Sequence, residues 1–258
     1  MRRMKSRLPT EHTNTILLVP LGDRINTDKT LPDGFCELLR LYCGAFYDGM
    51  EVAMLSKPLS LHNCRSRESR QGAETHRQYL IGDIFQLMGS HREVLGHRRA
   101  FCVVGFTMED IYPGEEWNFV FGQARPMERV GVFSFARHDP CFYGEMAPGP
   151  QTSATLLWRA MQTMTHEIGH IFGMEHCVYY KCLMNGSNHA LEAASRPSVL
   201  CPVCLQKLYH AIRFDPHKRY VGLVDALGAI AGRLKRDTVE GSIQRAREWL
   251  TRRLAHWE

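Results

Sequence analysis

The pattern of apolar and polar positions in the first half of the chain predicts a sheet with helices packed against it. Residues 15–21, 50–55 and 101–106 are short apolar runs, as expected of buried strands. Residues 35–47 and 79–88 instead repeat apolar side chains at helical spacing. Because predicted strands and helices alternate along the chain, we expect an α/β arrangement.

Less regular segments separate and follow these elements. Asp48-Gly49 is a turn signal, and the Arg-rich residues 61–78 form either a long loop or a hairpin. Two further strand-like runs follow at 117–122 and 130–135. Residues 136–151 are rich in Pro and Gly, which predicts a surface loop near a cleft.

A long helix is predicted for about residues 153–172, because apolar side chains recur along one side. That stripe would bury the helix and leave a polar edge facing a cleft. Another helix should begin near Cys204 and continue past Leu208. The stripe of the long helix consists of Leu156, Leu157, Met161, Met164, Ile168 and Phe172.

The end of the chain predicts an amphipathic helix from Asp237 to Trp257. Asp237 and Glu240 have the spacing of a capping box, which satisfies backbone N–H groups at a helix start. An apolar face of this kind more often packs on the core than on a partner. It would consist of Val239, Ile243, Ala246, Leu250, Leu254 and Trp257.

The long helix also carries a candidate zinc site. His166 and His170 lie one helical turn apart, so both rings can reach one metal ion from the same side. Gly173 predicts a turn with φ > 0 that ends the helix and returns His176 as a third ligand. Three nitrogen ligands leave one tetrahedral position open, as in catalytic zinc sites, and Glu167 is placed to reach a metal-bound water. Three histidines with ordinary partners on a helix are the alternative interpretation.

A second candidate metal site begins at the next residue. Two cysteines, Cys201 and Cys204, have the spacing that lets both sulfurs face one ion, and Cys177 and Cys182 supply the other half. Four thiolates complete the coordination sphere, so such a zinc would be structural. Two disulfides or four unpaired buried thiols are the alternatives. Because Cys177 adjoins His176, we expect the structural zinc to stiffen the active site.

Composition fits an ordinary folded domain. The chain has 258 residues, of which 44% are apolar and 23% charged, and its net charge is +5. Basic residues gather at the N-terminus, around residues 92–99 and in the final helix, where a solvated surface is favoured over a nucleic-acid interface. The first residues lack the apolar stretch of a secretory signal, and we find no apolar run long enough for a membrane-spanning helix.

The cysteine count bears on the compartment. Of nine cysteines, four are assigned to zinc, and the remainder is odd in number with no shared spacing. This favours a reducing environment, so we expect a cytoplasmic protein, with nuclear presence also compatible, and not a secreted one. The remaining cysteines are Cys36, Cys43, Cys64, Cys102 and Cys141.

The chain resembles a known family. The run HEIGHIFGMEHC at 166–177, with CLM at 182–184 and CPVC at 201–204, resembles the archaemetzincins, a branch of the metzincin zinc proteases. All metzincins share the helix pattern, while the interleaved cysteines are specific to this branch. No metal-binding position departs from it. The resemblance covers most of the chain through further stretches at 101–113, 117–138, 184–189 and 200–208.

The resemblance implies two zinc ions per chain, one catalytic and one structural. Glu167 would be the general base and acid. Met184 would lie beneath the catalytic metal, as a methionine of metzincins does, although a plain core methionine also fits the sequence. The ligands would be His166, His170 and His176 for the catalytic zinc, and Cys177, Cys182, Cys201 and Cys204 for the structural zinc.

The implied fold is a metzincin-like zincin fold of the α/β (α+β) class. It combines a mixed twisted sheet, a long zinc-binding helix and a helical C-terminal part. We therefore expect a flexible leader at 1–13, a catalytic domain with two zinc sites at 14–220, and a helical tail at 221–258 that packs on the same domain.

The expected mechanism is hydrolysis by a zinc-bound water, whose pKa falls to about 7 on zinc. Glu167 would take the proton and pass it to the leaving amine. Metzincins hold their peptide along an edge strand, and residues 130–136 are the best candidate. Tyr179, Tyr180 and Tyr209 are candidates for assisting the oxyanion, and the sequence does not choose among them.

The favoured function is that of a zinc metallopeptidase, including an aminopeptidase-like form. A catalytically silent zinc-binding interaction protein is the alternative, since ligands can persist without turnover. A nucleic-acid-binding zinc module is less favoured, because the cysteine clip lacks flanking basic and aromatic residues. We expect a peptide or protein substrate, a monomer, and neither a membrane nor a nucleic-acid partner.

Overall fold

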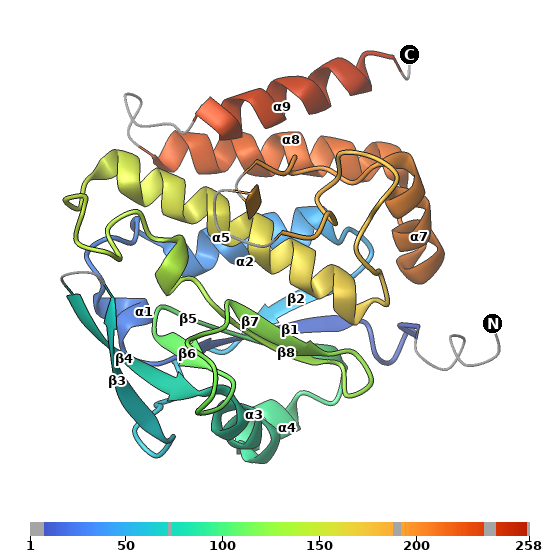
Figure 1. Cartoon of the computed structure of the whole chain (residues 1–258). Helices are drawn as coiled ribbons and strands as arrows, with labels where there is room; N and C mark the ends of the chain where they lie inside the picture. The colour runs from blue at the N-terminus through green and yellow to red at the C-terminus, as the bar shows by residue number, and fades with distance from the viewer. Residues whose placement is uncertain (1–7, 72–73, 188–191, 194, 235–240, 257–258) are drawn as a thin grey trace.

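The protein is described from a computed structural model, for residues 8–71, 74–187, 192–193, 195–234 and 241–256. A twisted central sheet runs through the molecule, and helices cover both of its faces (Figure 1). Helices α5 and α2 lie on one face, with α8 and α9 stacked outside them, while α3 and α4 lie on the opposite face. The predicted mixed α/β class is confirmed.

The central sheet has the strand order β2-β1-β5-β8-β7. Strands β2 (Glu51–Met54), β1 (Thr15–Leu21), β5 (Ala100–Thr107) and β8 (Val130–Ser134) are parallel neighbours. Strand β7 (Gly122–Arg125) runs antiparallel to β8 at the edge. Parallel neighbours cannot be joined by a tight turn. A helix at Phe35–Phe46 lies in the connection from β1 to β2, whereas the connection from β5 to β8 contains no helix.

The sheet separates two apolar cores. Alternate residues of β1 enter different cores: Ile16 and Leu18 face one, while Leu17, Val19 and Leu21 face the other. All seven residues of β1 are buried. This double burial accounts for the continuous apolar run at 15–21 in the sequence.

The larger core lies under the C-terminal helices. Helices α2 (Phe35–Phe46) and α5 (Pro150–Ile171) contact each other, α8 (Pro216–Arg233) packs on α2, and α9 (Gly241–Leu254) packs on α8. The opposite core is closed by α3 (Ile81–Ser90) and α4 (Arg92–Gly96). Helix α8 passes through position 220, where we expected the tail to begin.

Three strands form a second, smaller sheet, and a buried 3₁₀ turn and two further helices complete the fold. The Arg-rich segment forms the hairpin alternative, with β3 (Ser66–Gln71) antiparallel to β4 (Glu74–Leu80). Strand β6 (Asp110–Tyr112) joins β4 in a second sheet. Asp110 forms a buried ion pair with Arg137, at 2.8 Å, from a 3₁₀ turn at Ala136–His138. Two short helices, α1 (Arg24–Thr27) and α7 (Pro202–Ile212), flank the larger core.

Most predicted elements are confirmed, with two shifts of boundary. Helix α3 begins at Ile81 rather than residue 79, because Tyr79 and Leu80 pair with β6. Helix α5 begins at Pro150, where proline is tolerated in the first turn, rather than near residue 153. Helix α7 begins at Pro202 and continues past Leu208, as expected.

The predicted strand at 117–122 is wrong. The strand is β7, Gly122–Arg125, which pairs residue by residue with β8. The aromatic side chains before it have other partners: Phe121 stacks on His138 with ring centroids 5.1 Å apart, and Phe119 lies beneath the Arg137 guanidinium at 3.6 Å. Both rings are half-buried against the 3₁₀ turn, so their apolar character does not mark a strand.

The C-terminal helix is confirmed for its described part. Ile243, Ala246 and Leu250 of α9 are buried, as its apolar stripe predicts. The expected cap residues Asp237 and Glu240 lie outside the described residues, as do Val239, Trp257 and residues 1–7. Helix α8 was not singled out in the sequence. Across the described ranges, we find no helix with the length and apolar character needed to cross a membrane.

Candidate metal centres

The three histidines of the motif converge at the end of α5. His166 and His170 lie on the last two turns of the helix, and His176 follows after the chain reverses. One ring nitrogen of each lies within 4.8 Å of the others. The Nε2 atoms of His166 and His170 are 3.0 Å apart, close to the ~3.3 Å that tetrahedral zinc with Zn–N near 2.0 Å requires. This donor set fits a zinc ion.

Backbone carbonyls orient two of these rings. His166 Nδ1 lies 2.8 Å from the carbonyl of Leu183, and His170 Nδ1 lies 2.6 Å from that of Met174. When each Nδ1–H donates to its carbonyl, Nε2 is left with a lone pair facing the centre. Gly173 makes the reversal with φ +84°, as the sequence predicts.

Burial keeps the rings neutral. It lowers the pKa of His166 to about 3, with the Arg196 charge adding to the effect. Burial also lowers the pKa of His170. Neutral imidazole is the form that binds metal, so these two residues are already in the ligand state at neutral pH.

Glu167 lies beside the centre, with its carboxylate 4.0 Å from His166 Nε2. Burial raises the pKa of Glu167 to about 7, although Arg196 acts in the opposite direction. A quarter of its side chain remains exposed. A carboxylate with such a pKa can both accept and release a proton near neutral pH.

Met184 packs closely against the helix that carries the two histidines. Met184 is fully buried, and a Cβ added at Gly169, between the two helical histidines, would lie 2.7 Å from the Met184 sulfur. Only glycine therefore allows this approach. Tyr47, directly after α2, supports the same helix, because its hydroxyl donates to the Thr165 carbonyl at 2.5 Å.

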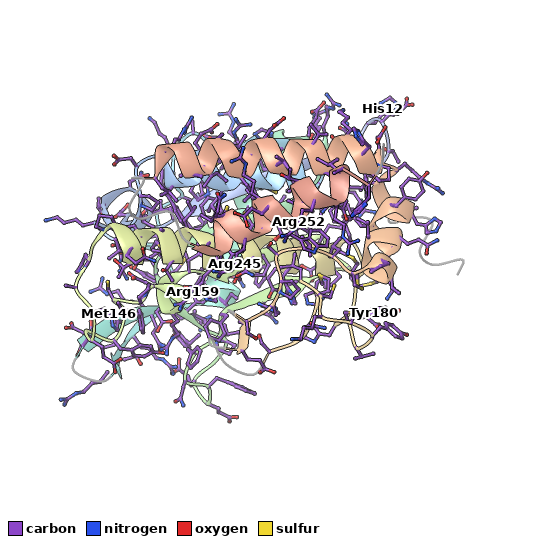
Figure 2. The ribbon with its side chains drawn as sticks, turned by 90° about the horizontal axis from the view of Figure 1, so that it is seen from above. His12, Met146, Arg159, Tyr180, Arg245 and Arg252 are labelled. Carbon is purple, nitrogen blue, oxygen red and sulfur yellow. The ribbon has the colours of Figure 1, made fainter. Side chains whose placement is uncertain are left out.

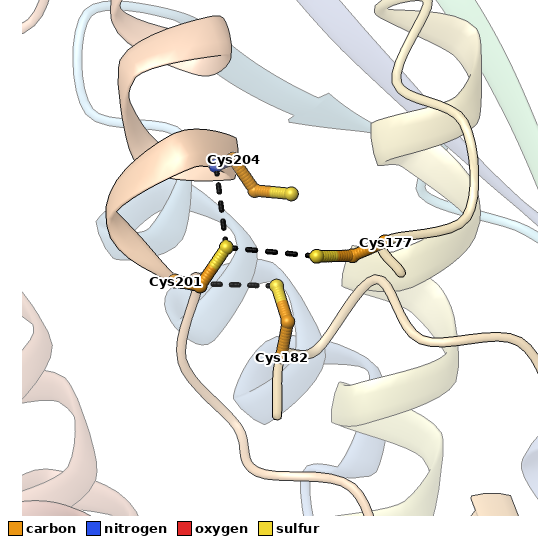
Figure 3. Close-up of side chains that lie close together, drawn as sticks. All are labelled: Cys177, Cys182, Cys201 and Cys204. Carbon is orange, nitrogen blue, oxygen red and sulfur yellow. Dashed lines mark hydrogen bonds between the residues drawn. The ribbon is translucent and has the colours of Figure 1, made fainter. Parts of the chain in front are cut away.

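The four cysteines form a second cluster (Figure 3). Their sulfur atoms all lie within 4.8 Å of one another, and all four residues are buried. The sulfurs of Cys177 and Cys201 are 3.6 Å apart, near the ~3.8 Å expected between thiolates on one tetrahedral zinc. None of the nine cysteines forms a disulfide. The donor set therefore fits zinc rather than the disulfide alternative.

One thiol of this cluster, that of Cys177, is poised to carry negative charge. Burial raises the pKa of Cys177, but backbone hydrogen bonds at Tyr179 and Tyr180, together with Cys201 and Cys204, lower it to about 7. Burial raises the pKa of Cys182 to about 11, and that of Cys204 further. One thiolate thus forms readily, while further ionisation calls for a cation among the sulfurs.

One short segment serves both centres. Cys182 belongs to the sulfur cluster, the next carbonyl accepts from His166, and the Met184 carbonyl accepts from the Cys177 backbone N–H at 2.8 Å. Asn185 completes the link: its side-chain amide donates to the Cys177 carbonyl at 2.7 Å and accepts from the Cys182 N–H at 2.8 Å. Hydrogen bonds through this segment therefore join the two clusters.

Two residues near the site escaped the sequence analysis. Asn185 bridges the cysteine segments, and Arg196 lies 2.9 Å from His166 Nδ1. The only sequence signal for Asn185 was its place in the MNGSNH stretch. The candidate tyrosines remain undistinguished, since Tyr179 and Tyr180 are exposed and Tyr209 is near the surface.

The expected peptide-binding strand is corrected by the topology. Residues 130–136 include β8, which lies between β5 and β7 and so has no free edge. The edge strand next to it is β7. The apolar character of β8 reflects burial in the sheet rather than exposure to a substrate.

A mixed sheet beneath a helix that carries two histidines, with a third after a glycine turn, defines the metzincin class of zinc peptidases. A family model described as Peptidase family M54 matches residues 73–210, more than half of the chain. The chain belongs to this family.

Curated relatives agree with this assignment. Archaemetzincin-2 of Homo sapiens is 38% identical over 242 residues, covering 84% of this chain and 65% of that protein. Archaemetzincin-1 of Homo sapiens is 33% identical over 213 residues, covering 73% of this chain and 41% of that protein. The predicted resemblance is confirmed, and the chain spans about two thirds or less of the length of these relatives.

Solved structures support the fold. The archaemetzincin of Methanopyrus kandleri superposes with a TM-score of 0.56 at 26% identity, over 80% of this chain and 98% of that one. The archaemetzincin of Archaeoglobus fulgidus gives 0.51 at 23% identity, over 75% and 99%. Both cover nearly the whole of the solved chain, so the expected zincin architecture is confirmed.

Proposed function

We propose that this protein is a zinc-dependent peptidase that hydrolyses peptide bonds at the histidine centre. The observation that carries the proposal is the convergence of three ring nitrogens, with a carboxylate of raised pKa beside them. His166, His170 and His176 would hold the catalytic zinc. Membership of a peptidase family supports the same activity.

When bound, zinc supplies a water whose pKa is near 7 and polarises the substrate carbonyl. The chain's own contribution is proton transfer by Glu167. Its carboxylate accepts a proton from the attacking water and, as a carboxylic acid, donates it to the amine that leaves. The pKa of about 7 suits both halves of this exchange.

We further propose that Cys177, Cys182, Cys201 and Cys204 hold a second, structural zinc. Four sulfur ligands would complete a tetrahedral shell and leave no place for substrate. The burial of all four residues supports this assignment. The shared segment at 182–185 would let the structural ion stiffen the catalytic centre.

The substrate would be a peptide or protein. The edge of β7 offers backbone groups to which an extended peptide could add as a further strand. Internal cleavage and aminopeptidase-like trimming use the same proton transfers, and digestion of a peptide library distinguishes them. A cytoplasmic location, suggested by cysteine usage, belongs to this proposal too.

The decisive experiment replaces Glu167 with alanine. We expect Glu167→Ala to lower kcat/KM by about 10³-fold or more, because proton transfer is lost, while zinc content and thermal midpoint stay unchanged. Glu175→Ala, an exposed glutamate of the same motif, is the matched control and should retain activity. A wild-type protein that binds zinc and cleaves no peptide would instead favour the silent zinc-binding alternative.

A further inference from the structure

Three large apolar side chains lie exposed just after the third histidine, and the proposed proton transfers do not use them. Val178, Tyr179 and Tyr180 are 84%, 66% and 58% exposed. Single exposed apolar residues are common on folded proteins, whereas a contiguous group marks a binding surface more often. Among the residues that the structure describes, no other large exposed apolar residues are neighbours in sequence. We refer to these three residues as the apolar loop.

The backbone of the apolar loop is held from the inside. Backbone hydrogen bonds from Tyr179 and Tyr180 reach the Cys177 sulfur, and the Tyr180 carbonyl accepts from the Asn185 side chain at 2.9 Å. The Met184 carbonyl in turn accepts from the Cys177 backbone N–H at 2.8 Å. Figure 2 shows Tyr180 at the periphery of the molecule. Because its backbone is already fixed, the loop presents exposed side chains and loses little backbone freedom when a ligand binds.

The apolar loop begins at the exposed side of the histidine centre. Of the three ligands, His166 is buried, His170 half-buried and His176 exposed, so solvent reaches the centre from the side of His176. Val178 follows His176 by two residues, which limits the distance between their Cα atoms to about 7 Å. Cys177 between them is buried in the sulfur cluster, while both of its neighbours are exposed. The exposed ligand and the apolar loop are therefore adjacent parts of one surface.

We propose that the apolar loop binds a large apolar side chain of the peptide substrate, within three residues of the cleaved bond. The inference rests on the proposed function, because it requires a peptide at the histidine centre. An extended peptide advances about 3.3–3.6 Å per residue, so three residues span about 10 Å. Tyr180 follows His176 by four residues and lies within about 14 Å of it. Two tyrosine rings suit this task, since they offer a large and rigid contact area.

The test compares peptides that differ only by phenylalanine or serine at one of the three positions on either side of the cleaved bond. We expect the wild-type zinc enzyme to prefer phenylalanine by about 10-fold in kcat/KM at one or more of these positions, because a ring leaves water there. Tyr179→Ser combined with Tyr180→Ser should reduce this preference to about twofold or less. Equal cleavage of both peptides by wild type, or a preference that survives the double variant, would overturn the proposal.

The matched control is Leu95→Ser. Leu95 is 63% exposed, and its helix α4 lies on the opposite face of the central sheet from α5 (Figure 1). Because this substitution removes a similar exposed apolar side chain far from the histidine centre, the phenylalanine preference should stay intact. Loss of the preference in Leu95→Ser would show that it does not depend on the apolar loop, and would overturn the proposal.

Further variants separate binding by the rings from chemistry by the hydroxyl groups. Tyr179→Phe and Tyr180→Phe keep the apolar surface, so the phenylalanine preference should remain within about twofold of wild type. Loss of the preference in these variants would assign it to the hydroxyl groups and overturn the proposal. Val178→Ser should by itself lower the preference about threefold. It decides the question if the double serine variant loses zinc, and an unchanged preference in Val178→Ser would then overturn the proposal.

A binding measurement separates this inference from the proposed function. Labelled phenylalanine and serine peptides are titrated into zinc-loaded Glu167→Ala and into the same variant carrying Tyr179→Ser and Tyr180→Ser. Tighter binding of the phenylalanine peptide, lost when the apolar loop is changed, supports the inference even if no preparation cleaves peptides. Cleavage by wild type with no preference between the peptides supports the proposed function and overturns this inference.

Discussion

The histidine and cysteine centres share one short segment but differ in how their side chains meet solvent. All four cysteines are buried, whereas His166 is buried, His170 half-buried and His176 exposed. The cysteine cluster has a full set of four donors, and the histidine cluster has three. A closed site and an open one therefore lie side by side, and they differ in donor number and exposure.

Removing one ligand from each centre is the strongest test of the difference between them. Cys204→Ser should lower the unfolding free energy by about 4 kcal/mol or more, because a structural metal contributes its binding energy to folding. His170→Ala should lose the other ion, with a smaller change in thermal midpoint. Zinc content and thermal unfolding of both variants are the measurements. Equal destabilisation would contradict the division into a structural and a catalytic centre.

Mild chelation tests the same division without a mutation. We expect two zinc ions in the purified protein, of which a chelator removes one quickly, because the histidine centre is open and its ligands are neutral. The retained ion should keep its four cysteine ligands protected from a thiol-reactive dye. Metal analysis before and after treatment gives the answer. A single ion per chain throughout would contradict the two-site proposal.

Asn185→Ala tests the link between the centres. The variant loses hydrogen bonds to Cys177 and Cys182, which should cost about 1–3 kcal/mol of stability. It should also weaken zinc binding at the histidine centre about 10-fold or more, because the carbonyl that orients His166 lies in the same segment. Asn63→Ala, at an exposed asparagine, is the control. Unchanged zinc affinity in Asn185→Ala would show that the centres are independent.

The smallest effect expected is on the acid side of the pH profile. Glu167 must be ionised to accept a proton, and burial raises its pKa to about 7, so activity should fall about 10-fold per pH unit below its pKa in the zinc enzyme. A bound cation would lower that pKa somewhat. The pKa of His166 is lowered to about 3, so loss of this ligand to protons needs a much lower pH.

The measurement is kcat/KM against pH at two free zinc concentrations. We expect the acid limb above pH 5 to be independent of zinc, because it reports Glu167. A limb that moves to lower pH as zinc increases would assign it to protonation of the histidine ligands instead.

Much of the fold could be predicted because its elements carry strong local patterns. The run at 15–21 is buried on both faces, and α5 carries a long apolar stripe. Each element can therefore be predicted from its own residues alone. Strand β7 could not be located in the same way. Its residues, Gly122–Arg125, have little apolar character, and pairing with β8 defines them. The edge position of β7 likewise follows from strand order, which local patterns do not encode.

Some residues of the candidate site could also be predicted from the sequence, and others could not. The three histidines and four cysteines were found from spacing alone, because metal ligands must recur at fixed offsets. Arg196 was not, since its contact with His166 joins residues 30 positions apart. Asn185 acts through backbone atoms of Cys177 and Cys182, and an asparagine in a loop gives no sign of such partners.

The packing of Met184 against Gly169 has a consequence for damage by oxidants. Met127 and Met146 are 72% and 52% exposed, whereas Met184 is completely buried. Peroxide should therefore convert the two surface methionines to sulfoxides first and leave the histidine centre intact. Because Met184 is completely buried, peroxide reaches its sulfur only when the packing around the segment at 182–185 opens. The rate at which peroxide inactivates the protein would then measure how often that segment opens.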